Sequence, residues 1–285
     1  MNLLRPAAIL ATLILAASAH ALELRPARTS PLDLAVQGLV KGLPPGKTGY
    51  LTWADLATLP KSKIKITGEF IPGEQEVTVV YLADLLKALP LEAKADTVLA
   101  TCVDDFAAVF PKSFIEHYKP FIVLEIAGKP SSAWPPPGIT YNPGPFPITV
   151  SARLAPDVDR YRDIAHKKPW GVGTITLVSY QEEFKAVYTG PWAHLSKGAQ
   201  EGREIWIHSC LCCHAGPAHL FAGTKANRPY PVIAAYAVYS PAYFKSYVRN
   251  PQDEATCAQM EAHPHYSEEE LDHLIEFIAA GNPKA

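Results

Sequence analysis

Three cysteines and a histidine fall within five consecutive residues of this 285-residue chain, in the stretch "HSCLCCHAG" that begins at His208. Cys210, Cys213 and His214 satisfy the pattern C-x-x-C-H. Residues three apart on one helical turn share a face, so both thiols would project to the same side. Two such thiols followed by an imidazole are typical of covalent haem attachment, with the histidine as the proximal iron ligand. The local fold would then form around a porphyrin.

Two other uses of the cysteines compete with haem. A thiol-disulfide pair should open a helix after a strand, and the flanking sequence lacks that pattern. A zinc site needs a second pair of ligands at a recognisable spacing, and the sequence offers only Cys257 and scattered histidines. Haem is therefore the favoured interpretation. On a helical turn Cys212 would point about 200° away from Cys210, so it is predicted to be an extra thiol. Trp206, four residues before Cys210, is predicted to pack near the haem plane.

A second iron ligand is suggested by Met260, one of only two methionines in the chain. It lies in the polar stretch "ATCAQMEAHPHYS" (255–267), which has no apolar face for a methionine to fill. A thioether ligand to iron is the role that this setting favours. His263 and His265 are competing distal ligands, interpreted as solvated loop histidines.

The first 21 residues are typical of a cleaved secretory signal. Arg5 precedes an apolar run from Ala7 to Ala17. Ala19 and Ala21 then occupy the small-residue positions of a signal-peptidase cleavage site. The run is too short to span a bilayer, and no later segment approaches the roughly 20 apolar residues required. We therefore expect a periplasmic protein in an oxidising compartment, without stable membrane insertion.

The charge balance excludes one class of partner. The net charge is −2 and the sequence has no basic run, which argues against nucleic acid binding. Five cysteines is an odd number, so an exported chain must keep a free thiol, an intermolecular bond or another covalent use.

The pattern of hydrophobic residues predicts two domains with a boundary near residue 190. Residues 22–190 are expected to form a strand-rich α+β domain, and residues 191–285 an all-α domain. Strand candidates are rich in β-branched residues and bounded by proline, glycine or aspartate. They are residues 63–70, 96–103, 120–128, 146–153 and 173–180, and residues 77–89 are expected to form a strand that runs into a short helix. The proline-rich segment 128–147 is interpreted as a surface connector.

Two helices of the second domain carry recognisable ends. Residues 196–210 are expected to be helical with Ser196 as the N-cap. Near the C-terminus, Ser267 and Glu270 form a capping-box pattern, and Gly281 is expected to close the helix. The apolar face of this last helix has helical spacing and consists of Leu271, Leu274, Ile275 and Ile278.

Residues 196–281 resemble a class I cytochrome c domain. The parts are a first helix ending in C-x-x-C-H, the segment "SPAYFKSYVRNP" (240–251), a loop with a methionine and a closing helix. The resemblance implies that His214 is the proximal ligand, that Met260 is the distal ligand, and that Cys210 and Cys213 form thioether bonds to one haem c.

Two features depart from that family. Glu261 follows the methionine, where the family often has proline. Cys212 and Cys257 are additional cysteines that either form a disulfide or remain unpaired thiols, and the sequence leaves both possibilities open.

Residues 45–185 resemble the molybdopterin-binding domain of the sulfite oxidase family. The similar segments are "LTWADLATLP" (51–60), "VVYLADLLKAL" (79–89), "VLATCVDDFAAVFP" (98–111) and "KPWGVGTITLVSY" (168–180). That family needs a cysteine thiolate as molybdenum ligand, on the strand before the "LADLL"-like helix. No cysteine occurs from Leu22 to Thr101. Cys102 lies on a later strand and is interpreted as a buried thiol. The domain is therefore expected to keep the scaffold without molybdopterin.

These observations favour an exported electron-transfer cytochrome with an N-terminal docking or binding domain and a redox partner protein of unknown identity. In this interpretation no residue is catalytic. The alternative is a molybdopterin-dependent oxidoreductase, similar to sulfite dehydrogenases, with a built-in haem c as its electron outlet.

Overall fold

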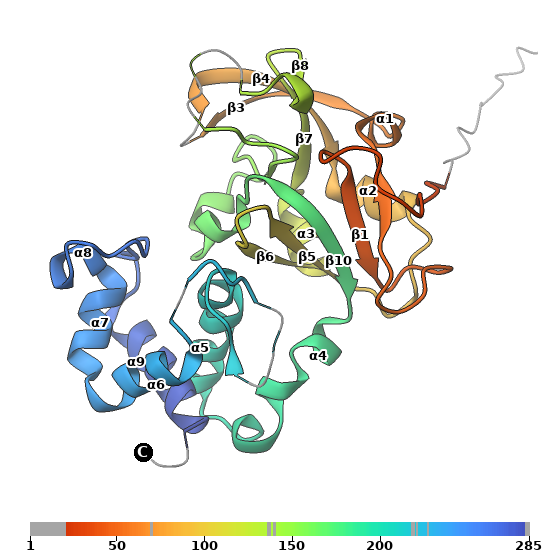
Figure 1. Cartoon of the computed structure of the whole chain (residues 1–285). Coiled ribbons are helices and arrows are strands. Elements are labelled where there is room, and N and C mark those ends of the chain that lie inside the picture. The colour runs from red at the N-terminus through yellow and green to blue at the C-terminus, as the bar shows by residue number, and fades with distance from the viewer. Residues whose placement is uncertain are drawn as a thin grey trace, which may run out of the picture.

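Strands and helices separate along the chain, as Figure 1 shows. The structure is a computed structural model that describes residues 21–68, 71–135, 138, 141–217, 220, 222–226 and 228–282. Within these residues all strands lie between Leu34 and Val178, and the chain from Tyr180 onward forms helices, turns and loops. A strand-rich part followed by a helical part is consistent with the expected two-domain layout. Residues 1–20 of the predicted signal lie outside the described residues.

The first sheet contains five strands. Their order is β2 (Gly49–Leu51), β1 (Leu34–Gly38), β10 (Val172–Val178), β5 (Thr97–Cys102) and β6 (Ala107–Pro111). β1 and β10 are parallel, and the other neighbours are antiparallel. The last strand of the chain therefore occupies the centre of the sheet and joins its early and later strands.

A second sheet lies beside the first. It consists of β3 (Ser62–Gly68), β4 (Ile71–Tyr81), β7 (Phe121–Ile126) and β8 (Lys129–Pro130), with β9 (Ile148–Thr149) paired to β7. Three short helices accompany the strands, namely α1 (Trp53–Leu56), α2 (Leu82–Ala88) and α3 (Lys112–Tyr118). The predicted strand-to-helix segment at residues 77–89 is confirmed by β4 and α2.

The first sheet is buried on both faces. On β5, Val98 and Ala100 enter the core of the strand-rich part, whereas Leu99 between them enters the core of the helices. β6 repeats the pattern, with Val109 packed toward the helices. Because side chains alternate along a strand, a sheet covered on both sides needs continuous apolar runs. The two parts of the chain thus share a hydrophobic contact through this sheet.

The helical part consists of six α-helices together with short 3-10 turns. The α-helices are α4 (Tyr180–Glu183), α5 (Lys197–His208), α6 (Tyr230–Tyr239), α7 (Pro241–Arg249), α8 (Pro251–Glu254) and α9 (Glu268–Ala280). α5 and α9 cross closely, because a Cβ atom added at Gly202 would lie 2.0 Å from the carbonyl oxygen of His273. Among the described helices, none combines the length and apolar character needed to cross a bilayer.

The predicted helix ends are found at both helices. Ser196 accepts a hydrogen bond from the backbone of Ala199, and the capping box of Ser267 with Glu270 is complete. Gly281 ends α9 with a right-handed φ of −83°, so its freedom to adopt positive φ is not used.

Two expectations are wrong in detail. α5 ends at His208, and a separate 3-10 turn covers Cys210–Cys212, so the first cysteine lies beyond the helix. The proline-rich segment 128–147 is not wholly a surface connector, because Trp134 and Phe146 are only 8% and 1% exposed. Trp134 packs on the second sheet and Phe146 in the main core of the strand-rich part.

Candidate functional site

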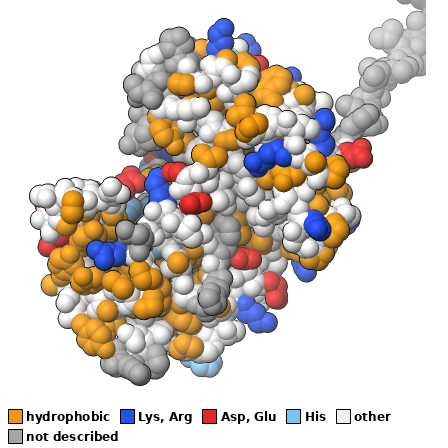
Figure 2. All heavy atoms as spheres, viewed as in Figure 1, with side chains coloured by type: hydrophobic (Ala, Val, Ile, Leu, Met, Phe, Trp, Pro, Cys, Tyr) orange, Lys and Arg blue, Asp and Glu red, His pale blue; other side chains and the backbone are white. Residues whose placement is uncertain are grey.

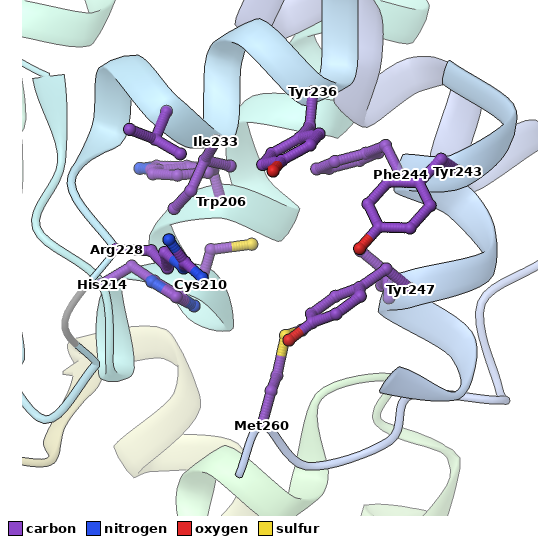
Figure 3. A pocket seen from close by; sticks show the side chains of 12 residues that line it. Trp206, Cys210, His214, Arg228, Ile233, Tyr236, Tyr243, Phe244, Tyr247 and Met260 are labelled. Atoms are coloured by element: carbon purple, nitrogen blue, oxygen red, sulfur yellow. The ribbon is translucent and has the colours of Figure 1, made fainter. Parts of the chain in front are cut away.

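A cavity of roughly 720 Å³, measured with its opening to solvent, lies between the end of α5, helices α6 and α7, and the loop before α9. Three predicted haem-site residues, Cys210, His214 and Met260, line it together. Figure 3 shows Cys210 and His214 on one side, aromatic rings of α7 on the other, and Met260 entering from its loop. The remaining lining residues are Trp206, Arg228, Val232, Ile233, Tyr236, Tyr243, Phe244, Tyr247 and Val248.

Cys213 is not among the described residues that line the cavity. The helix ends before the cysteines, so Cys210 and Cys213 do not share the helical face that the spacing predicted. Burial raises the pKa of the Cys213 thiol to about 11, and the nearest charges are Lys225 and Asp104. These two residues form an ion pair of 2.6 Å between the helical part and the β5–β6 turn. The Cys213 thiol therefore lies toward the strand-rich part.

The imidazole of His214 is partly buried and incompletely hydrogen-bonded. One hydrogen bond joins it to the backbone of Arg228, while Nδ1 has no partner among the described residues. Burial lowers the pKa of His214, so the ring is neutral at pH 7. The indole Nε1 of Trp206 in the same cavity is also buried without a partner. Unpaired buried polar atoms cost free energy, so both point to a group that the chain itself does not supply.

Met260 lies in an irregular loop, as predicted. The side chain is partly buried against the helical core. Two backbone carbonyls of this loop, those of Ala258 and Met260, accept hydrogen bonds of 3.2 and 3.0 Å from the side-chain amide of Gln252. A third bond joins the backbone of His263 to Val248 in α7 at 3.0 Å. The loop is thus tied to α7 and α8.

The two competing histidines do not line the cavity. The ring of His263 packs against that of His166 in the strand-rich part, with 5.3 Å between centroids. Burial lowers the pKa of His263 to about 4. The interpretation of His263 as a solvated histidine is therefore wrong, while His265 is exposed as expected.

Aromatic residues of α6 and α7 form a wall that the sequence interpretation missed. The rings of Tyr236 and Tyr243 are 5.3 Å apart, and those of Tyr243 and Tyr247 are 5.8 Å apart. Figure 2 shows hydrophobic side chains gathered over these helices, where Tyr236 is 45% exposed. The available signal was the spacing of tyrosines at intervals of three or four residues from 236 to 247.

The two additional cysteines are free thiols in the structure, like the other three. Cys212 is fully buried, with its sulfur 3.6 Å from the carbonyl oxygen of His208, whereas Cys257 is exposed. Like Cys213, Cys212 is absent from the described cavity lining, so its role as the extra thiol remains a prediction.

Cys102 ends β5 and is buried, as expected for a strand thiol. Burial and the Asp104 carboxylate raise its pKa to about 12. Asp104 and Asp105 form a turn, and Asp105 has a left-handed φ of 65°.

The chain matches no protein-family model and no curated protein sequence. Among solved structures it is similar to a chain of the sulfane dehydrogenase SoxCD from Paracoccus pantotrophus, at 14% identity and a TM-score of 0.36. The match covers 56% of this chain and 42% of that chain, which is less than half of the latter.

Proposed function

We propose that the chain is an exported c-type cytochrome that transfers electrons through one covalently bound haem c. The observation that carries this proposal is the meeting of Cys210, His214 and Met260 on one apolar cavity. Residues 46 positions apart in sequence supply the imidazole and the thioether.

The residues of the cavity fit a porphyrin. Trp206 and the tyrosine wall offer flat apolar surface, and Arg228 and the unpaired indole Nε1 of Trp206 offer donors to carboxylates on a porphyrin rim. His214 is neutral, and the backbone of Arg228 orients it, as a metal-binding imidazole requires.

The bound haem supplies reversible one-electron transfer. His214 and Met260 would hold the haem iron with an imidazole and a thioether and thereby keep substrates away from it. The aromatic wall of α6 and α7 would limit access of water to the group. Cys210 would form the first thioether bond, and the second requires the turn after Cys212 to direct the Cys213 thiol into the cavity.

In this proposal the strand-rich part serves as a docking or binding module, and a redox partner protein delivers or removes the electron. The signal-like residues 1–21 support a periplasmic location.

The test is expression with a haem c attachment system, followed by a visible spectrum and acid-acetone extraction. We expect a pink protein whose haem remains with the polypeptide after extraction. Cys210→Ala combined with Cys213→Ala should abolish retention, and Cys257→Ala, an exposed cysteine outside the cavity, should not. Unchanged haem content in the double variant would overturn the proposal.

One observation favours the alternative of a molybdopterin-dependent oxidoreductase. Lys225, which follows the cysteine turn, forms an ion pair with Asp104, two residues after Cys102, so a molybdenum centre at Cys102 would lie close to the turn that carries Cys210 and Cys213. However, the thiolate of that family belongs on the strand before the α2 helix, whereas Cys102 ends the later strand β5. The position of Cys102 therefore fits a molybdopterin centre poorly. A measured content of one molybdenum per chain, lost in the Cys102→Ser variant, would favour the oxidoreductase over the cytochrome.

A further inference from the structure

A short segment of the strand-rich part, residues 162–167, contacts two segments that flank the cavity, namely the turn before Cys210 and the end of the Met260 loop. His166 has a ring nitrogen 3.3 Å from the hydroxyl of Ser209, the residue directly before Cys210. Asp163 accepts a hydrogen bond from the hydroxyl of Tyr266, which closes the loop of Met260. All four of these side chains are at least 94% buried.

Tyr266 ties the end of the Met260 loop to the strand-rich part. Its hydroxyl donates a hydrogen bond to the side chain of Asp163. The backbone carbonyl of Tyr266 also accepts a bond of 3.2 Å from Arg249 of α7. Segment 162–167 therefore holds both the end of the Met260 loop, through Asp163, and the turn that carries Cys210, through His166 and Ser209.

We infer that Asp163 is a positioning residue for the bond between Met260 and iron. Through the hydroxyl of Tyr266 it holds the Met260 loop at a fixed distance from the turn that carries Cys210 and His214. The inference rests on the proposed function. It also makes the strand-rich part a structural component of the haem site, in addition to a docking module.

Two physical arguments support this role. The Met260 loop has no regular secondary structure, so its position depends on a small number of hydrogen bonds such as those from Gln252. A hydrogen bond to a carboxylate is about twice as strong as one between neutral groups. Removing one partner of such a buried bond costs free energy, because the other group is left buried without a partner. Arg162 lies beside Asp163, with 3.4 Å between Nε and the carboxylate, and it also binds Glu270. The buried Lys167 is a second cation whose charge interacts with Asp163.

Imidazole added to the ferric protein competes with Met260 for iron, so its apparent affinity reports how firmly the loop holds the thioether. Asp163→Ala and Tyr266→Phe should each bind imidazole roughly tenfold more tightly than the wild type, because each breaks the same bond. The double variant should resemble either single variant, since coupled residues are not additive. Asp163→Asn should be closer to the wild type, because its amide oxygen still accepts from Tyr266.

Asp159→Ala is the matched control, because Asp159 is an exposed carboxylate four residues before Asp163. It should leave imidazole affinity unchanged. A merely structural Asp163 would lower thermal stability in Asp163→Ala while imidazole affinity stayed at the wild-type value, and that result would overturn the inference alone. A protein without covalent haem would instead overturn the proposed function. Tyr266→Phe keeps the aromatic ring, so it tests the same bond if Asp163→Ala does not fold.

Discussion

The ammonium of Lys167 lies 3.1 Å from Nδ1 of His208, at the junction between the two parts of the chain. Lys167 is fully buried and also donates to the carbonyl of Val109 on β6. His208 is the last residue of α5, and burial with the nearby cation lowers its pKa, so its neutral ring can accept this bond. A buried cation with only neutral acceptors in contact makes the junction sensitive to alkaline pH.

Replacement Lys167→Met should change how stability depends on pH. Burial lowers the pKa of Lys167 from 10.5 to about 8. Between these values the unfolded chain holds a proton that the folded chain has lost, so this group makes the free energy of unfolding rise with pH. The expected slope is about 1.4 kcal/mol per pH unit between roughly pH 8 and 10.5. Denaturant unfolding across this range should show that slope lost in Lys167→Met and kept in Lys168→Met.

Replacement His166→Gln should reduce acid sensitivity. Burial lowers the pKa of His166 from 6.5 to about 3. Below pH 6.5 this histidine binds a proton in the unfolded chain but not in the folded chain. The free energy of unfolding therefore decreases by about 1.4 kcal/mol for each unit by which the pH is lowered. Unfolding measured between pH 6.5 and 4.5 should show a shallower fall in His166→Gln. The exposed His194→Gln is the control, and an equal change there would contradict the prediction.

Replacement Gly202→Ala should destabilise the helical part by about 1–3 kcal/mol. The added methyl group would lie 2.0 Å from the backbone carbonyl oxygen of His273, and backbone cannot move aside without separating α5 from α9. The effect is measured by thermal unfolding of Gly202→Ala and of the comparison variant Gly198→Ala. Gly198→Ala on the same helix meets only side-chain atoms of His273 and Glu276, so its loss should be smaller. Equal losses would contradict the close-crossing explanation.

Replacement Gln252→Ala should weaken the bond between Met260 and ferric iron. The side-chain amide of Gln252 donates to the carbonyls of Ala258 and Met260, and its removal frees this stretch of loop. The weak far-red absorption band of thioether-ligated ferric haem should lose intensity. Gln200→Ala removes a similar bond, to the carbonyl of Leu195, away from the cavity and should leave the band unchanged. An unaltered band in Gln252→Ala would show that the loop is held by other contacts.

Local sequence signals determined much of this protein. Ser196, Ser267 and Glu270 mark helix starts, because side-chain caps act within a few residues. β-branched runs located β4, β5, β7 and β10 for the same local reason. Two residues of the C-x-x-C-H pattern, Cys210 and His214, meet Met260 at one cavity, whereas Cys213 does not line it, and the haem itself remains a prediction.

Only the tertiary structure decided the rest. No local pattern could place Asp163 beside Tyr266, 103 residues later, or stack His166 on His263, because contacts between distant segments depend on how the sheet and helices pack. The end of α5 at His208 likewise separated the faces of Cys210 and Cys213, which the spacing alone placed together. Helical periodicity predicts a shared face only while the helix continues, and the chain left the helix to meet the strand-rich part.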